Sequence, residues 1–122
     1  MKTKVTEITK DPRGFIELKL LNTNEAFDLA EAKLQFESVL KITDGKSYKL
    51  LVDTTDSNVS PTKEAQAFIL SIDKRIAEAF IVKSLAYKIL ARFYMKSSKN
   101  NPTRIFTSRK KAIDWLNSFD ED

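Results

Sequence analysis

The chain has 122 residues, of which 42% are hydrophobic and 31% charged, with a formal net charge of +4. These values predict one folded domain and exclude an intrinsically disordered chain. The sequence has no histidine, no cysteine and two glycines, which excludes a thiolate nucleophile, an imidazole base, a disulfide, the usual zinc and copper sites and a glycine-rich phosphate loop. We therefore expect no enzyme, no cofactor and no metal, although a carboxylate-only Mg²⁺ or Ca²⁺ site stays open. The start of the chain lacks the apolar run of a signal peptide, so we expect a cytoplasmic protein.

The first third of the chain predicts a hairpin followed by a helix. Residues 4–9 and 15–21 are rich in β-branched and apolar side chains, which favours two strands. Pro12 presets a turn conformation and Gly14 tolerates a positive φ, so the residues between these strands predict a hairpin turn. A helix is expected from about Asn24 to Ile42, because apolar side chains recur there at helical spacing after a polar start.

A central strand and a second helix come next. The apolar run from Tyr48 to Thr54 predicts a central strand, and a polar loop follows it. Ser60 is suited to cap a helix with Pro61 in its first position. Apolar residues at helical spacing carry this predicted helix to about Ile76.

The last third repeats the alternation of strand and helix. We expect a strand at 79–82, a helix at 85–97, a loop at 100–102, a strand at 104–107, and a closing helix capped by Ser108. The acidic tail at 120–122 is expected to fray from a single domain at 1–119. The order β-β-α-β-α-β-α-β-α predicts a mostly parallel mixed α/β sheet of about five strands, with an N-terminal hairpin and about four helices.

Three features of this order resemble a known family. The chain begins with a hairpin, and the strand Leu50-Leu51-Val52-Asp53 runs into a polar loop and a helix. The segment Pro102–Ser108 is followed by a helix that contains Ala112-Ile113-Asp114-Trp115-Leu116. Together these features resemble the STAS superfamily, and within it the SpoIIAA-like group of small stand-alone bacterial proteins, over essentially the full length of the chain.

The resemblance implies a non-enzymatic regulatory or protein-interaction domain. Anti-sigma-factor antagonists of this fold bind a partner kinase and are switched by phosphorylation of a serine in a D-S-S/T-G loop after the central strand. The matching loop here contains Asp53, Asp56, Ser57 and Ser60, which we take as the candidate switch or ligand residues. It lacks the second hydroxyl residue and the glycine. The SpoIIAA-like group also resembles lipid-carrying CRAL-TRIO domains, which implies contact with a membrane or an apolar ligand as the alternative.

A basic segment is the second candidate site. Residues 83–111 hold nine basic side chains and no acidic one, although the whole chain has 17 acidic residues. On the helix expected at 85–96, three cations share one arc of about 80°. The predicted partner or membrane surface comprises Lys88, Arg92, Lys96, Tyr87, Tyr94 and Met95. The predicted lining of an apolar pocket comprises Leu85, Ile89, Leu90 and Phe93.

The broad apolar surface of this helix leaves four interpretations open. The four interpretations are buried core, the wall of an apolar pocket, an interface to a protein partner or a second copy, and a surface for an anionic membrane. No nucleic acid is expected, because no helix-turn-helix or RNA-recognition signature accompanies the basic residues. An enzyme built on the carboxylates of Asp53 and Asp56 is the weakest alternative.

Overall fold

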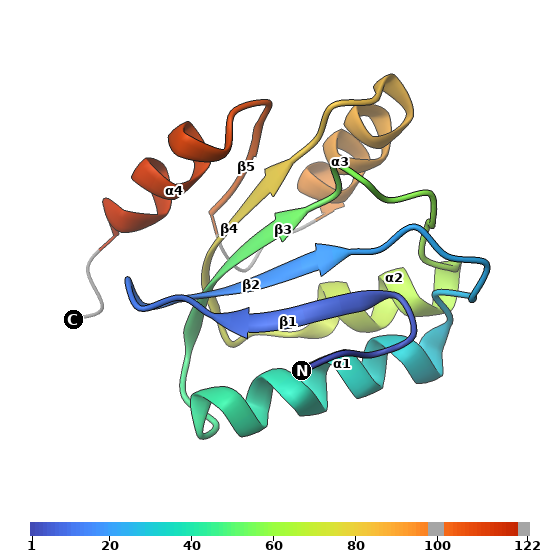
Figure 1. The fold of residues 1–122 in the computed structure, drawn as a ribbon, viewed down its shortest axis with the longest axis horizontal. Helices are drawn as coiled ribbons and strands as arrows, with labels where there is room; N and C mark the ends of the chain where they lie inside the picture. The colour runs from blue at the N-terminus through green and yellow to red at the C-terminus, as the bar shows by residue number, and fades with distance from the viewer. Residues whose placement is uncertain (98–101, 120–122) are drawn as a thin grey trace.

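The structure is a computed structural model that describes residues 1–97 and 102–119. Residues 100–101 of the loop predicted at 100–102, and the acidic tail at 120–122, lie outside the described residues. Within the described residues five strands and four helices follow the predicted order (Figure 1). They are β1 (Thr6–Lys10), β2 (Phe15–Leu20), α1 (Leu29–Thr43), β3 (Tyr48–Asp53), α2 (Lys63–Ser71), β4 (Arg75–Ile81), α3 (Leu85–Ser97), β5 (Thr103–Phe106) and α4 (Arg109–Asn117).

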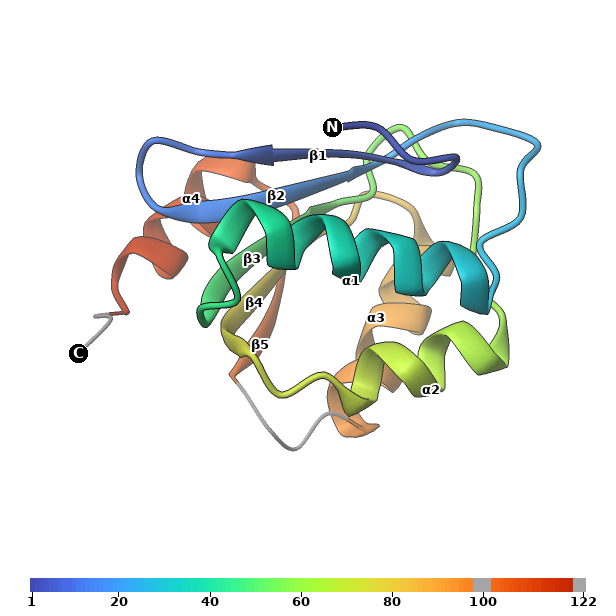
Figure 2. The ribbon, with the colours of Figure 1, turned by 90° about the horizontal axis from the view of Figure 1, so that it is seen from below.

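The five strands form one mixed sheet in which the spatial order β1-β2-β3-β4-β5 equals the chain order. β1 pairs with β2 antiparallel, and every later neighbour pairs parallel. Because each right-handed crossover moves one strand further in the same direction, α1, α2 and α3 cover the same face of the sheet. α4 follows the last strand and covers the opposite face (Figures 1 and 2). The mixed α/β architecture predicted from the sequence is confirmed.

The hairpin turn is confirmed where it was predicted. The Asp11 amide donates to the Phe15 carbonyl over 2.9 Å, and the Gly14 amide donates to the Asp11 carbonyl over 2.9 Å. Gly14 has a φ of 100°, a conformation that glycine adopts at little energetic cost because it has no side chain. Local turn chemistry thus specifies this connection without help from the rest of the fold.

The turn also holds an ion pair whose effect on titration is testable. Arg13 Nε donates to Asp11 Oδ1 over 2.8 Å, and this side-chain hydrogen bond lowers the pKa of Asp11 from 3.8 to about 2. A lowered native pKa means that Asp11 contributes stability above pH 4 and loses that contribution as the pH falls toward 2. In an NMR titration, Arg13→Gln is expected to return the Asp11 pKa toward 3.8. An Asp11 pKa that stays near 2 in the variant would contradict this assignment.

Two helices begin later than predicted, because different residues cap them. α1 begins at Leu29, since the Asp28 side chain accepts from the Glu31 amide over 2.9 Å. α2 begins at Lys63, and its cap is Thr62 and not Ser60. Pro61 lies outside the helix because it forms a parallel bridge with Phe27. Pairing with a segment distant in the chain therefore overrides the local capping signal. The predicted Ser108 cap of α4 is confirmed by its contact with the Lys111 amide.

The boundary between α2 and β4 also differs from the prediction. The helix was expected to continue to Ile76, but it ends at Ser71 and β4 already begins at Arg75. Ile72 has an extended backbone with ψ 125°. Ile72 and Ile76 are four residues apart, so apolar spacing alone cannot distinguish another helical turn from an extended segment.

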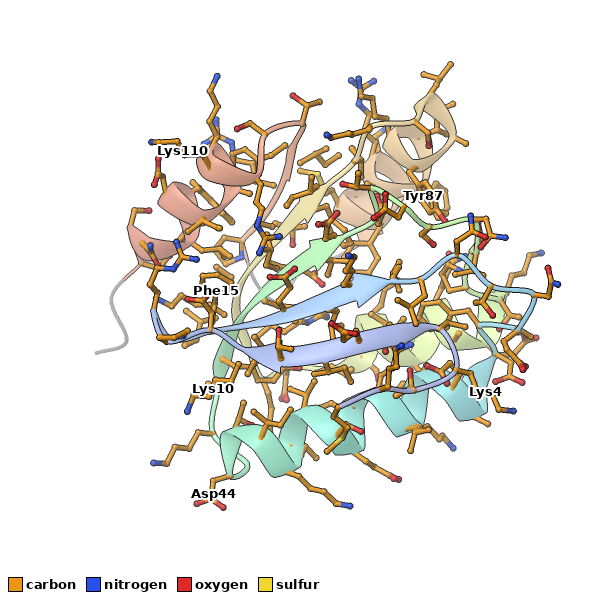
Figure 3. The ribbon with its side chains drawn as sticks, in the orientation of Figure 1. Lys4, Lys10, Phe15, Asp44, Tyr87 and Lys110 are labelled. Atoms are coloured by element: carbon orange, nitrogen blue, oxygen red, sulfur yellow. The ribbon has the colours of Figure 1, made fainter. Side chains whose placement is uncertain are left out.

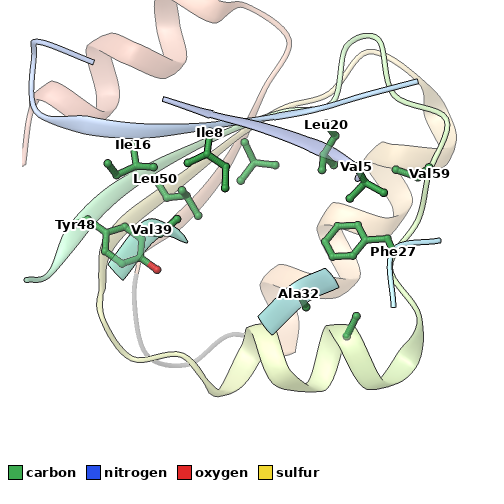
Figure 4. Packing of buried hydrophobic residues seen from close by; sticks show 12 residues of the cluster. Val5, Ile8, Ile16, Leu20, Phe27, Ala32, Val39, Tyr48, Leu50 and Val59 are labelled. Carbon is green, nitrogen blue, oxygen red and sulfur yellow. The ribbon is translucent and has the colours of Figure 1, made fainter. Parts of the chain in front are cut away.

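The core has two parts, one on each face of the sheet. Leu50 and Val52 of β3 belong to the part under α1 and α2, shown in Figure 4. Leu51 faces the other way, toward α4, and joins Phe15 and Leu116 there. A strand buried on both faces reads as a continuous apolar run, which explains the pattern of β3. Within residues 1–97 and 102–119, no helix combines the length and apolar character needed to cross a membrane.

Candidate binding site around helix α3

Helix α3 presents two apolar faces. Its inner face contributes Tyr87, Leu90, Ala91 and Tyr94 to the wall of an internal cavity. Its outer face carries Leu85, Ile89 and Phe93, which are 73%, 61% and 66% exposed. Leucine, isoleucine and phenylalanine are seldom left this open on an isolated domain, so the outer face is a candidate contact surface.

This arrangement corrects the predicted placement of several side chains. Tyr87 and Tyr94 were predicted for the outer surface, yet both line the cavity. Of the predicted pocket residues only Leu90 lines that cavity, while Leu85 lies on the outside. Ile89 and Phe93 border a shallow surface groove. Apolar residues surround most of α3, so the hydrophobic spacing did not identify a single buried face. The observed buried face is rotated from the predicted one by about 100°, the angle between successive residues of a helix.

The Tyr87 hydroxyl connects α3 to the loop after β3 (Figure 3). It donates to the Val59 carbonyl oxygen and lies 2.9 Å from Ser57 Oγ. The Val59 amide also donates to Ser57 Oγ, over 3.2 Å. The Tyr87 ring is half-buried, and these partners satisfy its hydroxyl on the inner side of α3.

The cavity lies between the sheet and the three helices α1, α2 and α3, and has a volume of about 130 Å³. Leucine, valine, isoleucine, alanine and aromatic side chains form most of its wall. The structure therefore contains a mostly apolar hollow that the chain itself does not fill.

A buried ion pair forms the polar part of this wall. Arg75 Nη1 lies 3.0 and 3.1 Å from the two carboxylate oxygens of Glu78, and each side chain is 2% exposed. Arg75 Nη2 donates to the carbonyl oxygens of Ile69 at 2.9 Å and Ile72 at 3.2 Å. The Tyr94 hydroxyl donates to Glu78 Oε1 over 2.9 Å. The network thus joins β4 to the end of α2 and to α3.

An irregularity in β4 brings this pair together. Tyr48 pairs with Arg75 and Lys49 pairs with Ala77, so Ile76 is an extra residue in the ladder. In a regular strand residues 75 and 78 would point to opposite faces, whereas the extra residue puts Arg75 and Glu78 on the same one. Burial raises the pKa of Glu78, and the charge of Arg75 opposes that rise.

Sequence reasoning missed both members of the pair. Arg75 fell within the helix predicted to continue to about Ile76, and Glu78 lay just outside the strand predicted at 79–82. One signal was present, since Glu78 is the single charged residue in the otherwise apolar run 76–82. Buried carboxylates are rarely left without a cation, so Glu78 indicated that a basic side chain is buried beside it.

The predicted aspartates of the loop after β3 form surface ion pairs. Asp53 Oδ1 accepts from the Thr55 amide over 2.9 Å, and Asp53 Oδ2 lies 3.4 Å from Arg109 Nη1. Asp56 Oδ2 lies 3.8 Å from Lys19 Nζ. Within the described part of the chain no group of three or more acidic side chains is placed to hold a metal ion.

The predicted serines of this loop do not meet a helix terminus. Ser57 contacts Tyr87, as described above, and Ser60 is exposed. Because α2 begins after Thr62, neither serine occupies the capping position from which a phosphate would contact the free amides of that helix. Ser57 makes a hydrogen-bond contact with α3, whereas Ser60 borders the surface groove beside that helix.

The predicted cations lie beside the exposed apolar residues. Arg92 and Lys96 are exposed, whereas Lys88 and Met95 are half-buried. Lys88 lies three residues after Leu85, and Arg92 three residues after Ile89, so these cations are neighbours of the exposed apolar residues on the helix surface.

Comparison with known proteins gives a family and a fold. A family model described as "Domain of unknown function (DUF7793)" matches residues 5–120, so the chain belongs to that family. A solved structure of an uncharacterised protein of the DUF3478 family from Shewanella loihica PV-4, described as having a SpoIIAA-like fold, is similar with a TM-score of 0.67. It is 14% identical, with 95% of this chain and 98% of that chain covered. No curated protein matches. The predicted SpoIIAA-like fold is confirmed.

Proposed function

We propose that this DUF7793-family protein is a non-enzymatic STAS-like domain that binds reversibly to an anionic membrane surface through the outer face of α3. The observation that carries the proposal is the exposure of Leu85, Ile89 and Phe93 next to Arg92 and Lys96. A helix with apolar side chains and cations on its outside lies in the interface of a bilayer, with the apolar groups among the acyl chains and the cations at the headgroups.

The magnitudes fit weak, reversible attachment. Burying three partly exposed side chains of this size contributes about 4 kcal/mol in total. Each cation close to an anionic leaflet adds about 1 kcal/mol, and this part weakens as salt is added. The residues of α3 include no acidic side chain to oppose that attraction. We therefore expect binding that needs anionic lipid and falls with ionic strength.

A protein partner is the second candidate, and the spacing of the exposed residues favours it. Leu85, Ile89 and Phe93 are four residues apart, the spacing at which a helix lays one stripe into a groove. A regulatory role through such a partner is what the STAS resemblance implies. A second copy of this chain is disfavoured at α3, because both copies would bring Arg92 and Lys96 into the same interface.

Co-sedimentation with lipid vesicles tests the proposal. The protein is expected to pellet with vesicles that contain phosphatidylserine, to stay in solution with pure phosphatidylcholine, and to dissociate as salt rises. Leu85→Ser/Ile89→Ser and Lys88→Gln/Arg92→Gln/Lys96→Gln should each reduce binding about tenfold or more.

Matched variants on α1 serve as controls. Leu34→Ser removes another exposed leucine, and Lys33→Gln/Lys41→Gln removes exposed cations on a different helix. These proteins are expected to bind vesicles as the parent does. Equal loss of binding in control and α3 variants, or no binding to anionic vesicles at low salt, would reject the membrane proposal. No vesicle binding leaves the protein-partner candidate.

A further inference from the structure

The wall of the cavity behind α3 includes a residue with a hydrogen-bond donor that has no acceptor. Arg75 Nε is buried and has no hydrogen-bond partner within the part of the chain that the structure describes. The other guanidinium nitrogens are all engaged, by Glu78 and by the carbonyl oxygens at the end of α2. A buried donor attached to a charged group is costly to leave without an acceptor.

Most of the cavity wall near Arg75 is apolar. Arg75 lines the cavity together with Leu50, Val52 and Ile69, whose side chains offer no acceptor. The neighbouring Tyr48, paired with Arg75 in the sheet, is 6% exposed and lines the same cavity. A mostly apolar hollow whose wall includes an unsatisfied donor has the character of a small-molecule site, in which apolar contact supplies affinity and a few polar groups supply orientation.

We propose that this cavity binds a small neutral molecule with an apolar body and one hydrogen-bond acceptor, which accepts from Arg75 Nε. The volume of about 130 Å³ suits a single ring or a short alkyl chain. A carboxylate is disfavoured, because Glu78 already neutralises Arg75 and a second anion would be repelled in a medium of low dielectric. A ketone, ester or ether oxygen meets the requirement without adding charge.

Helix α3 is the cover of this site. Tyr87 and Tyr94 close the cavity from that side, and each is held through its hydroxyl, by Val59 and by Glu78 respectively. The sheet, α1 and α2 form the remaining walls. The exposed outer face of α3 takes no part in this site, so the inference is independent of membrane binding.

A matched pair of probes tests the inference by NMR. The ketone 2-hexanone and the hydrocarbon 2-methyl-1-hexene have nearly the same shape, but only the ketone has an acceptor. We expect saturable shift changes at cavity residues such as Leu50, Val52 and Ile69, with the ketone bound about tenfold or more tightly. Absence of saturable binding by either probe would overturn the site. Equal affinities would overturn the role of Arg75 Nε.

Filling the cavity provides the second arm. Ala32→Leu on α1 and Ala91→Val on α3 both add methyl groups at the cavity wall and should each weaken 2-hexanone binding about tenfold or more. Ala30→Leu is the matched control, because residue 30 is exposed on the same helix. Binding that survives both filling variants, or shift changes that cluster at Leu85 and Ile89, would place the probe elsewhere and reject the inference.

Discussion

Arg75→Met is expected to destabilise the fold by about 3–5 kcal/mol, because it leaves the Glu78 carboxylate buried without its cation. Arg75 supplies the nearest positive charge, with Nη1 3.0 Å from Oε1. Glu78 would have to take up a proton or draw water into the core. Urea unfolding followed by circular dichroism measures the loss directly.

The double variant Arg75→Met/Glu78→Leu separates a buried charge from a general loss of packing. With both charges gone, the same volume is filled by apolar atoms, and most of the stability should return. A double variant as unstable as Arg75→Met would show that shape, and not the unpaired carboxylate, sets the cost. A single variant within 1 kcal/mol of the parent would contradict the buried pair itself.

Leu116→Ala is expected to lower the free energy of unfolding by about 2–5 kcal/mol, the usual range for a buried leucine. Leu116 is 0% exposed and packs with Phe15 and Leu51 on the face that α4 covers. The face opposite α1 and α2 depends on this one short helix, so few neighbouring side chains are available to fill the space that is vacated.

Leu34→Ala is the control for that measurement. Leu34 also lies on a helix, but it is 45% exposed, and its loss should cost well under half as much as the loss of Leu116. Thermal or urea unfolding of both proteins gives the comparison. Equal destabilisation would mean that α4 is not packed on the sheet as the structure places it.

The features that the sequence predicted well have local causes. Pro12 and Gly14 specify their turn within a few residues, and alternating strands and helices dictate a parallel sheet once crossovers are right-handed. Ser108 caps α4 because its own side chain reaches an amide three residues later. None of these features depends on what packs against the element.

The features that were missed depend on distant contacts. The start of α2 is set by the bridge between Phe27 and Pro61, which are far apart in the chain. The partnership of Arg75 and Glu78 needs an extra residue in β4 that only the pairing with β3 reveals. The face of α3 is chosen by the hydroxyl partners of two tyrosines, which hydrophobic spacing does not encode.

The two faces of α3 have different surroundings. Its tyrosines hold it over the cavity, and its exposed apolar and basic residues remain available to a surface outside the molecule. A buried ion pair at the cavity wall anchors the inner face, since Tyr94 joins α3 to Glu78. On the outer face Leu85 and Ile89 are exposed, which makes that face the accessible place to measure an interaction.

A fluorescent label at residue 89 tests membrane binding through α3 most directly. The chain has no cysteine, so Ile89→Cys provides a unique attachment point for an environment-sensitive dye, and Leu34→Cys provides the matched site on α1. Anionic vesicles are expected to shift the emission of the dye at residue 89 to the blue and leave the dye at residue 34 unchanged. No shift at residue 89, or equal shifts at both sites, would contradict binding through the outer face of α3.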